Sequence, residues 1–371
     1  MRENFLPAHG GQLHELAAEF GVSESSLLDF SASIDPRPPS DLVVDTLCDA
    51  LRARTILTAY PDMHYSALKE AIAAYVQVDV QTIAIDSGVM PLLSAALNAL
   101  RPRRCLVAVP AFAEYRKVLD MCGVECSTFT STHDTDFLVD GAKMAASLKA
   151  SGAQAVLLAN PQSPSGRLMP AGELLRLHEA ASALGATTIV DEAFIDYAPE
   201  NGISQWAARS PKLIVLRSLT KFFAMPGLRV AYAVSCPEIR AAIESRIPAW
   251  PVGSIAAEAA RMVLQDRPSI RQTRAANAVE RSWLVEQLRA LGLRVFPAAA
   301  NYLLIKIDAS RNGQEFWQRL IVEHRILLRS CANFEGLDGH YFRIGVRTRP
   351  QNELLVSALH NVLHLSPLSE E

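Results

Sequence analysis

Short apolar runs alternate with longer helical patterns over the first two thirds of the chain, and this alternation restricts the possible folds most. The runs are TIAID (82–86), CLVAV (105–109), AVLLA (155–159), TTIV (187–190), LIVL (213–216) and VAYAV (230–234). Strands of a parallel sheet that are buried on both faces read as such continuous apolar runs. The pattern therefore predicts an α/β fold with a mostly parallel central sheet that is covered by helices.

A second block begins near residue 250 and has a different character. A long helical pattern ends at Gly292, and it is followed by strand-like runs at 294–307 and 341–346 and by a last helix from about Asn352. Glycine commonly follows the last turn of a helix. We therefore expect an N-terminal arm over residues 1–40, a large domain over 41–250 and a smaller α+β domain over 251–371.

Polar and aromatic residues follow the apolar runs of the large domain. Just past five of the runs stand Ser87-Gly88, Phe112, Asn160, Asp191 and the segment 218–221. In open α/β sheets, ligands bind beyond the carboxyl ends of the strands. We therefore expect these residues to share one pocket.

Lys221 stands at the end of an apolar run, between apolar neighbours. A lysine taken singly is most often a solvated surface residue. An amine held among apolar and cationic groups, however, has a lowered pKa and can form a Schiff base with an aldehyde. Ser218 and Arg229 could bind a phosphate beside that amine, one by its hydroxyl and one by its guanidinium. An aldehyde cofactor that carries a phosphate is pyridoxal phosphate.

That cofactor makes two further demands on charge. Its pyridine nitrogen needs a carboxylate to stay protonated, and Asp191 could supply it, although a helix or turn cap is the alternative for this residue. Its phosphate needs backbone amides at a helix start, and Ser87, Gly88 and Val89 precede a helical pattern that has proline near its first turn.

The ring of the cofactor makes two more demands. Phe112 could stack on it, although plain core packing is the alternative. Asn160 in NPQSPSG could donate to its phenolic oxygen, although an Asn-Pro turn is the alternative. Each of these assignments is weak alone, but together and in this order they point to one cofactor site.

The ordered series resembles the fold type I pyridoxal-phosphate enzymes of the aspartate aminotransferase superfamily, over nearly the whole chain. The matching motifs are the helix start at 87–89, NPQSPSG, DEAF, SLTK and GLR. The resemblance implies that Lys221 binds the cofactor, that Asp191 pairs with its pyridinium, and that Ser218 and Arg229 bind its phosphate. It also implies a homodimer in which Tyr60 reaches the cofactor phosphate of the neighbouring subunit.

Finer motifs resemble the histidinol-phosphate aminotransferase branch and, within it, the L-threonine-O-phosphate decarboxylases. The most specific of them is RSCANFEGLDGHYFR. The resemblance implies that Arg329 and Arg343 bind the substrate and that Phe194 stands where aminotransferases of this branch usually carry a tyrosine. Because Phe194 cannot donate a hydrogen bond to the cofactor's phenolic oxygen, it fits a decarboxylase better.

The far end of a phosphorylated substrate needs its own donors. His9, Gly10 and Gly11 offer an imidazole and backbone amides, and Ser31 and Ser33 could assist them. The alternative is a flexible arm. Asn160, in the cofactor site, would also contact the substrate.

The chain departs from the usual decarboxylase pattern at several positions near that end, which are Gln12, Ser33, Asp35, Pro251 and Gly253. Three reactions therefore stay open. The first is decarboxylation of O-phospho-L-threonine to 1-amino-2-propanol phosphate in cobalamin synthesis. The others are decarboxylation of a related phospho- or phosphono-amino acid and transamination of the histidinol-phosphate type.

The charge and the composition of the chain limit the classes of partner that we expect. The chain has 36 basic and 39 acidic residues, a formal net charge of -3 and no basic stripe, so nucleic acid is not expected as a partner. No apolar run approaches the ~20 residues that cross a bilayer, so no membrane partner is expected. The six cysteines and nine histidines show no metal-site spacing. We expect a cytoplasmic enzyme without a metal.

Overall fold

The computed structural model describes Pro7 and residues 9–364. Its main sheet has seven strands in the order β2-β8-β7-β6-β5-β3-β4. They are β2 (Ile83–Asp86), β3 (Arg104–Val109), β4 (Glu125–Thr130), β5 (Ala155–Ala159), β6 (Thr187–Asp191), β7 (Leu213–Ser218) and β8 (Ala231–Val234). Strand β8 runs antiparallel to both of its neighbours, and the other neighbouring pairs are parallel. The predicted α/β class and mostly parallel sheet are confirmed, since all six apolar runs form strands.

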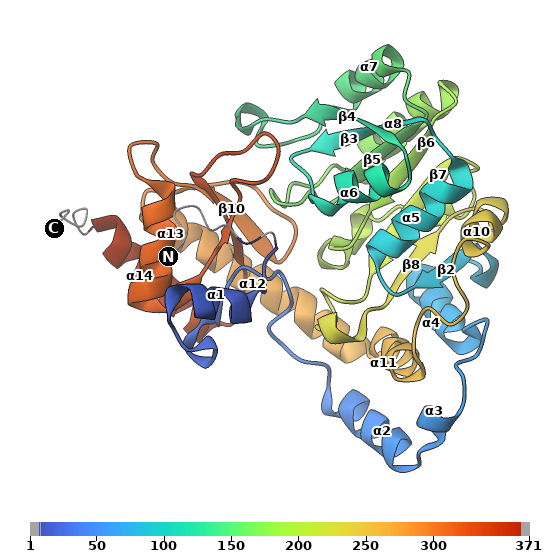
Figure 1. Cartoon of the computed structure of the whole chain (residues 1–371), viewed down its shortest axis with the longest axis horizontal. Coiled ribbons are helices and arrows are strands. Elements are labelled where there is room, and N and C mark those ends of the chain that lie inside the picture. Colours follow the sequence, from blue (N-terminus) through green and yellow to red (C-terminus); the bar gives the residue numbers. More distant parts are fainter. Residues whose placement is uncertain (1–6, 8, 365–371) are drawn as a thin grey trace.

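Helices cover both faces of this sheet (Figure 1). Successive strand residues point to opposite faces, so Val215 of β7 lies in one apolar cluster and its neighbours Ile214 and Leu216 lie in another. The cluster of Val215 includes side chains of α4 (Ser66–Val76), α7 (Gly141–Ser151), α8 (Ala171–Ala183) and α11 (Ser254–Gln265). The opposite cluster includes side chains of α5 (Val89–Leu100), α6 (Glu114–Met121) and α10 (Pro237–Glu244). The sheet is thus the middle of three layers.

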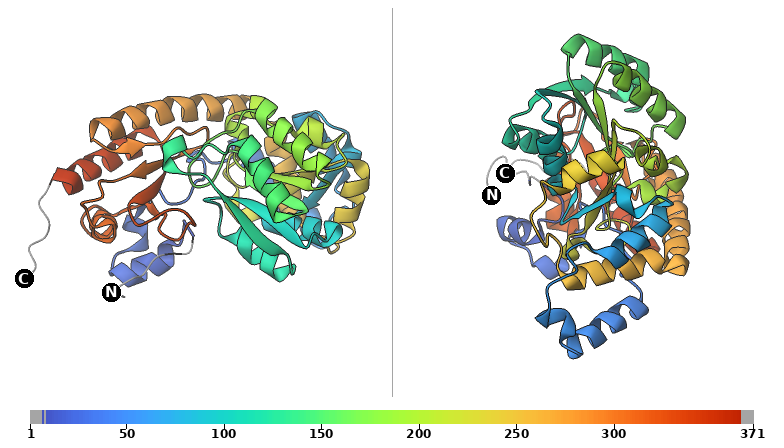
Figure 2. Two further views of the ribbon diagram at one scale, coloured as in Figure 1. Left: turned by 90° about the horizontal axis from the view of Figure 1, so that it is seen from above. Right: turned by 90° about the vertical axis from the view of Figure 1, so that its right-hand side faces the viewer.

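A smaller antiparallel sheet forms the other half of the molecule, in the order β12-β13-β10-β9. Its strands are β9 (Arg294–Val295), β10 (Tyr302–Lys306), β12 (Arg329–Ser330) and β13 (Tyr341–Gly345). The accompanying helices are α12 (Arg267–Ala290), α13 (Gly313–His324) and α14 (Arg349–His364). Figure 2 shows α12 running along one side of both halves.

The N-terminal arm packs mainly on this smaller half. It contains α1 (Leu13–Phe20) and β1 (Leu28–Asp29), and β1 pairs in parallel with β11 (Ile326–Leu327). Leu16 and Phe30 are buried in the small-domain core. The core of the large sheet, in turn, includes α11 and extends to Ile270. We therefore propose that the two domains divide inside α12, which lies beyond the boundary that we expected at residue 250.

Two short helices, α2 (Asp41–Arg52) and α3 (Thr55–Thr58), extend from the large domain at the bottom of Figure 1. A third short helix, α9 (Ser204–Ala207), precedes β7. None of the helices formed by the described residues combines the length and the apolar character that crossing a membrane requires.

Candidate active site

The carboxyl ends of three neighbouring parallel strands bring the predicted residues together. Asp191 is the last residue of β6, and the backbone amide of Asn160, just after β5, donates to its carbonyl at 2.8 Å. Ser218 is the last residue of β7, and Lys221 follows three residues later. Side chains far apart in the sequence meet here because parallel strands end at the same edge.

The amine of Lys221 has the character that the sequence predicts. Burial, and after it the nearby positive charges of Arg343 and Arg229, lower its pKa to about 8, whereas Asp191 acts in the opposite direction. A neutral amine is therefore populated near neutral pH, in contrast to a solvated surface lysine. Lys221 can act as a nucleophile and as a proton carrier.

The carboxylate of Asp191 is held by two donors. The hydroxyl of Tyr115 donates to Oδ2 at 2.6 Å, and the amide of Ala193 donates to Oδ1 at 2.9 Å. Burial raises the pKa of Asp191, and both hydrogen bonds oppose that rise. Sequence reasoning missed Tyr115, although the motif PAFAEY places it one helical turn after Phe112, whose carbonyl accepts from the Tyr115 amide at 3.1 Å.

A cationic cup lies at the start of α5. Helix α5 begins at Val89, and Gly88 precedes it. A Cβ atom on Gly88 would lie 3.1 Å from Nη2 of Arg229, so the guanidinium packs against the glycine backbone. The Ser87 amide already donates to Asp86 at 2.6 Å, which leaves Gly88 and Val89 as the better placed amides for an anion.

The other predicted cofactor residues are largely held by their neighbours. The Ser218 hydroxyl lies 2.8 Å from that of Thr220. The Asn160 side chain bonds both to the carbonyl and to the amide of Met169. The ring of Phe112 lies against Tyr115, and the ring of Phe194 meets Tyr302 edge-on at 4.9 Å.

Arg329 and Arg343 stand directly opposite each other on β12 and β13. Arg329 donates to Asn333 at 2.8 Å, and burial, with a contribution from the charge of Arg343, lowers its pKa to about 10. Arg343 donates to the Ser31 carbonyl at 3.0 Å and to the Ser163 hydroxyl at 3.3 Å, both neutral acceptors. Like charges directly opposite destabilise a sheet, so this arrangement favours a site for an anion.

The N-terminal segment contacts both the Arg343 region, through Ser31, and the Lys221 region, through Asp35. The Gly11 amide donates to the Ser31 hydroxyl at 2.9 Å, and a Cβ atom on Gly10 would lie 2.3 Å from the Ser31 carbonyl. The Asp35 amide donates to the carbonyl of Lys221 at 3.1 Å. Among the described residues, the buried Ser33 hydroxyl has no hydrogen-bond partner.

His9 lies beside the predicted ring site. Its imidazole is 5.6 Å from the ring of Phe112, and its Nε2 is 3.1 Å from Oε1 of Glu114. Gln12, one of the departures, accepts the His9 amide at 2.8 Å and so shapes this turn.

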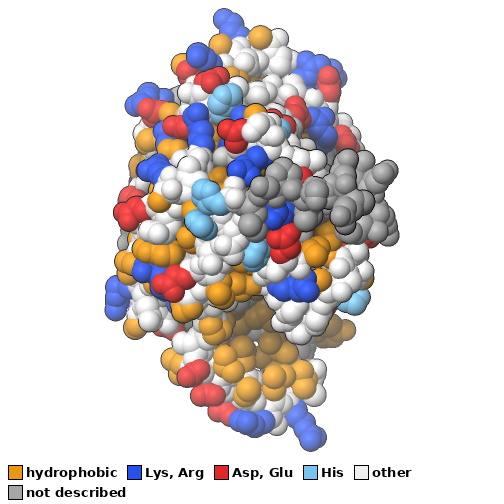
Figure 3. Space-filling view, turned by 90° about the vertical axis from the view of Figure 1, so that its left-hand side faces the viewer, with side chains coloured by type: hydrophobic (Ala, Val, Ile, Leu, Met, Phe, Trp, Pro, Cys, Tyr) orange, Lys and Arg blue, Asp and Glu red, His pale blue; other side chains and the backbone are white. Residues whose placement is uncertain are grey.

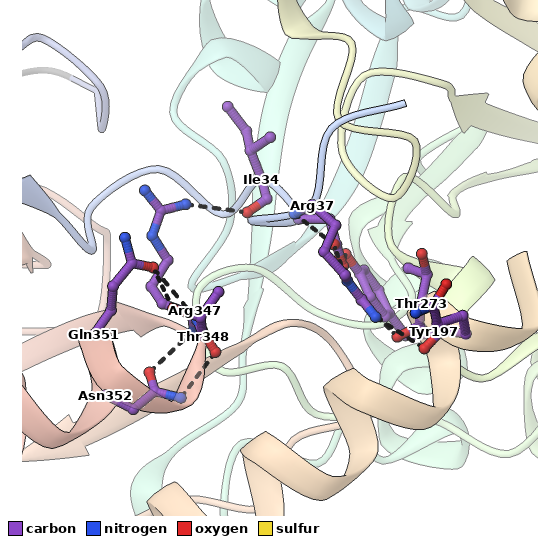
Figure 4. Close-up of polar contacts among 10 residues, drawn as sticks. Ile34, Arg37, Tyr197, Thr273, Arg347, Thr348, Gln351 and Asn352 are labelled. Atoms are coloured by element: carbon purple, nitrogen blue, oxygen red, sulfur yellow. Dashed lines mark hydrogen bonds and ion pairs between the residues drawn. The ribbon is translucent and has the colours of Figure 1, made fainter. Parts of the chain in front are cut away.

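Two of the remaining departures, Asp35 and Gly253, do not add a free charge to the site. Asp35 accepts two hydrogen bonds of 3.0 Å from Arg37 and one of 3.2 Å from the hydroxyl of Tyr197 (Figure 4). Arg37 also donates to the carbonyls of Gln272 and Thr273 in α12. Gly253 caps the start of α11 and has no atom near its Cβ position. The Asp35 charge is therefore compensated rather than presented to a ligand.

Tyr60 is the one predicted cofactor residue that the single chain leaves outside the site. It is 79% exposed, and it stacks on Trp250 at 4.5 Å. Its segment follows α3, on the part of the large domain that projects from the rest.

Comparison with known proteins agrees with this geometry. Residues 27–359 match the family described as aminotransferase class I and II. The chain is 36% identical to the threonine-phosphate decarboxylase of Salmonella typhimurium, over 97% of both chains. It is 29% identical to the adenosylcobalamin biosynthesis bifunctional protein CobDQ of Leptospira interrogans, over 97% of this chain and 41% of that protein.

A solved structure shows the same fold. The histidinol-phosphate aminotransferase from Sinorhizobium meliloti, in complex with pyridoxal-5'-phosphate, superposes with a TM-score of 0.84 at 20% identity, over 98% of both chains. The chain therefore belongs to the aminotransferase class I and II family, with the type I fold of pyridoxal-phosphate enzymes.

Proposed function

We propose that this protein is a pyridoxal-phosphate-dependent decarboxylase that converts O-phospho-L-threonine to 1-amino-2-propanol phosphate and CO2 in cobalamin synthesis. The observation that carries the proposal is the facing pair of Arg329 and Arg343, of which Arg343 lies near enough to the Lys221 amine to lower its pKa. Two guanidiniums match a substrate that bears both a carboxylate and a phosphate. The 36% identity with a threonine-phosphate decarboxylase supports the same substrate.

The residues present fit the cofactor. The positive charges of Arg229 and Arg343 both act on Lys221, and Asp191 is the carboxylate that acts against them, so an anionic cofactor improves the charge balance. Lys221 would bind its aldehyde, Asp191 its pyridine nitrogen, and Ser218, Arg229 and the amides at 87–89 its phosphate. The close approach of the Arg229 guanidinium to Gly88 brings its charge beside the amides at the start of α5, where the phosphate would lie.

Three aromatic or amide side chains would complete the cofactor site. Phe112 would cover one face of the ring. Asn160 has a second amide hydrogen beyond the one given to Met169, and that hydrogen could reach the phenolic oxygen. Phe194 offers no such donor, which distinguishes this site from one with tyrosine there.

The side chains of the protein would then direct the reaction. When bound, pyridoxal phosphate supplies a conjugated ring that accepts the electron pair of a bond broken at the substrate α carbon. Arg343 would hold the carboxylate in the orientation from which CO2 leaves. Asp191 would keep its negative charge beside the ring nitrogen. Lys221, with a pKa of about 8, would deliver the proton that replaces CO2 on the α carbon.

The N-terminal segment would close the site. His9, Gly10, Gly11, Ser31 and Ser33 would hold the substrate phosphate, with Arg329 assisting. Burying a doubly charged phosphate without such donors would be costly. The buried Ser33 hydroxyl, which has no hydrogen-bond partner within the described part of the chain, could donate to that phosphate. Covering the site also excludes water from the reaction.

A homodimer in the cytoplasm completes the proposal. The projecting α2–α3 region exposes large apolar side chains, namely Leu42, Val44, Leu51, Leu57, Tyr60 and Met63. Figure 3 shows hydrophobic side chains gathered on this lowest part of the molecule and in the hollow above it. Exposed apolar patches of this kind mark protein interfaces. Tyr60 would reach the cofactor phosphate of the partner subunit across that interface.

One assay tests the reaction. Purified protein with pyridoxal phosphate, and with 2-oxoglutarate as the acceptor for an amino group, is incubated separately with O-phospho-L-threonine, O-phospho-L-serine, a phosphonate analogue, threonine and histidinol phosphate. CO2 release and transamination, followed as the keto acid or ketone formed together with glutamate, are measured separately. We expect CO2 release with O-phospho-L-threonine and little keto acid. Faster CO2 release from phosphoserine or the phosphonate would transfer the proposal to that substrate. If keto acid were the main product, transamination would replace decarboxylation as the proposed reaction. The fold that the chain shares with a histidinol-phosphate aminotransferase supports this second candidate.

A further inference from the structure

A cavity lined by three arginines lies apart from the Lys221 site. Its volume is ≈ 250 Å³. Its polar and charged walls include Tyr75, Asp196, Ser204, Arg217, Arg267 and Arg274. Pockets for drug-sized ligands usually measure about 300–1,000 Å³, so this one suits a smaller molecule.

The cavity is separated from the cofactor site by the main sheet. Arg217 and Ser218 are consecutive residues at the end of β7. Successive side chains of a strand point to opposite faces. Ser218 therefore faces the predicted cofactor phosphate, and Arg217 faces the cavity on the side of α4 and α12.

Arg217 is buried, and only some of its hydrogen-bond donors have partners among the described residues. Its guanidinium donates to Asp196 at 2.6 Å and to Glu192 at 3.3 Å. Its Nε atom is buried and has no hydrogen-bond partner among the described residues. The two carboxylates therefore compensate its charge but leave one of its donors unused.

The other two guanidiniums contact neutral groups. Arg274 donates to the backbone carbonyl of Asp196 at 2.7 Å and to the hydroxyl of Tyr75 at 3.0 Å. Arg267 donates to the Ala74 carbonyl at 3.3 Å and lies over the ring of Tyr75. Within the described part of the chain, neither has a carboxylate in contact, so the walls carry more positive than negative charge.

We infer that this cavity binds a small, multiply charged anion that bears phosphate or carboxylate groups. Guanidiniums bind both groups through paired, charge-assisted hydrogen bonds. The anion would lie between Arg267 and Arg274 and take up their unused donors. Because Asp196 precedes Tyr197, whose hydroxyl donates to Asp35, the cavity adjoins a side chain that holds the N-terminal segment.

The test uses the cofactor-loaded enzyme and two probes, inorganic phosphate and citrate, with glycerol as the uncharged control. Binding is followed by calorimetry and by the fluorescence of Trp206, an exposed neighbour of Ser204 and Gln205. We expect at least one of the two anions to bind, and its affinity to fall at least tenfold in Arg267→Ala. Arg271→Ala, an exposed arginine of the same helix, should bind like the wild type.

A third variant separates this cavity from the active site. Arg343→Ala should retain anion binding at the cavity, because Arg343 lies in the small-domain sheet. Binding that is lost in Arg343→Ala but kept in Arg267→Ala would assign the anion to the active site and overturn the inference, as would the absence of binding by both anions. Tighter binding of citrate would show that the cavity prefers carboxylate groups, and tighter binding of phosphate would show that it prefers phosphate groups. None of these outcomes depends on which amino acid is decarboxylated.

Discussion

Tyr115 and Asp191 form a 2.6 Å hydrogen bond that joins the first turn of α6 to the end of β6. The hydroxyl donates to the carboxylate that we assign to the cofactor's pyridine nitrogen. Tyr115 is only 2% exposed, so no solvent competes for this bond. The negative charge of Asp191 therefore depends on a residue from a different element.

Replacing Tyr115 with phenylalanine should weaken the reaction without removing the cofactor. A hydrogen bond to a charged group contributes about 1.5–3 kcal/mol, so we expect kcat to fall about tenfold or more. The bond lowers the pKa of Asp191. Its loss should raise that pKa, and the acidic limb of the kcat profile should move to higher pH. An unchanged pH profile would show that Tyr115 only fills space.

Lys221 should bind the cofactor at a rate that follows its pKa of about 8. The neutral amine is the reactive form, so the rate at which apoenzyme takes up pyridoxal phosphate should rise with pH and level off above about 8. Borohydride reduction and peptide mapping should then label Lys221. A rate that keeps rising to pH 10, or a label on another lysine, would contradict this assignment.

Arg343 should contribute far more than a surface charge. Exposed ion pairs contribute ~0–1 kcal/mol, whereas truncating one partner of a buried charge pair costs about 2–5 kcal/mol. Arg343→Ala should therefore lower kcat/KM by about two to three orders of magnitude, with the cofactor spectrum unchanged. Arg343→Lys keeps the charge but not the planar fork, and it should recover only part of the loss. A loss below tenfold in Arg343→Ala would rule out the carboxylate role.

Phe194→Tyr should change the balance between the two reactions. The new hydroxyl can donate to the cofactor's phenolic oxygen, so we expect a shifted absorption maximum and slow keto-acid formation. Phe194→Leu is the control, because it also alters the edge contact with Tyr302 but adds no donor. The same spectrum and the same ratio of CO2 to keto acid in the tyrosine variant would refute this role.

Asp35→Asn should destabilise the protein through Arg37. The Asp35 side chain is 1% exposed and that of Arg37 is 27% exposed. Because Arg37 is partly solvated, we expect a cost of about 1–3 kcal/mol, below the 3–5 kcal/mol of a fully buried pair. The midpoint of urea unfolding measures it. Asp49→Asn, in the exposed pair with Arg52, should leave the midpoint nearly unchanged. Equal midpoints for the two variants would show that the Asp35 pair contributes no more than an exposed one.

Local pattern was enough to predict the large sheet and its ligand edge. Each of the six apolar runs forms a strand, because a strand buried on both faces needs apolar residues at consecutive positions. Strand β4, ECSTFT, was not predicted because its residues are partly or fully exposed and therefore lack that pattern, whereas β2, at the opposite edge of the sheet, is buried and was predicted. The cluster of Asn160, Asp191 and Lys221 could be predicted because parallel strands share one carboxyl edge.

Contacts between distant segments decided the rest. The sequence indicates that Arg329 and Arg343 belong together, but only the β12–β13 register places them face to face. The sequence places the carboxylate of Asp35 near the expected phosphate end of the substrate, but only the fold pairs it with Arg37 and Tyr197. In the sequence Tyr115 is indistinguishable from other helix residues, and only the position of β6 brings Asp191 to its hydroxyl. Periodicity reports which face of an element is buried, whereas the partner of a buried polar group depends on tertiary packing, which no local pattern encodes.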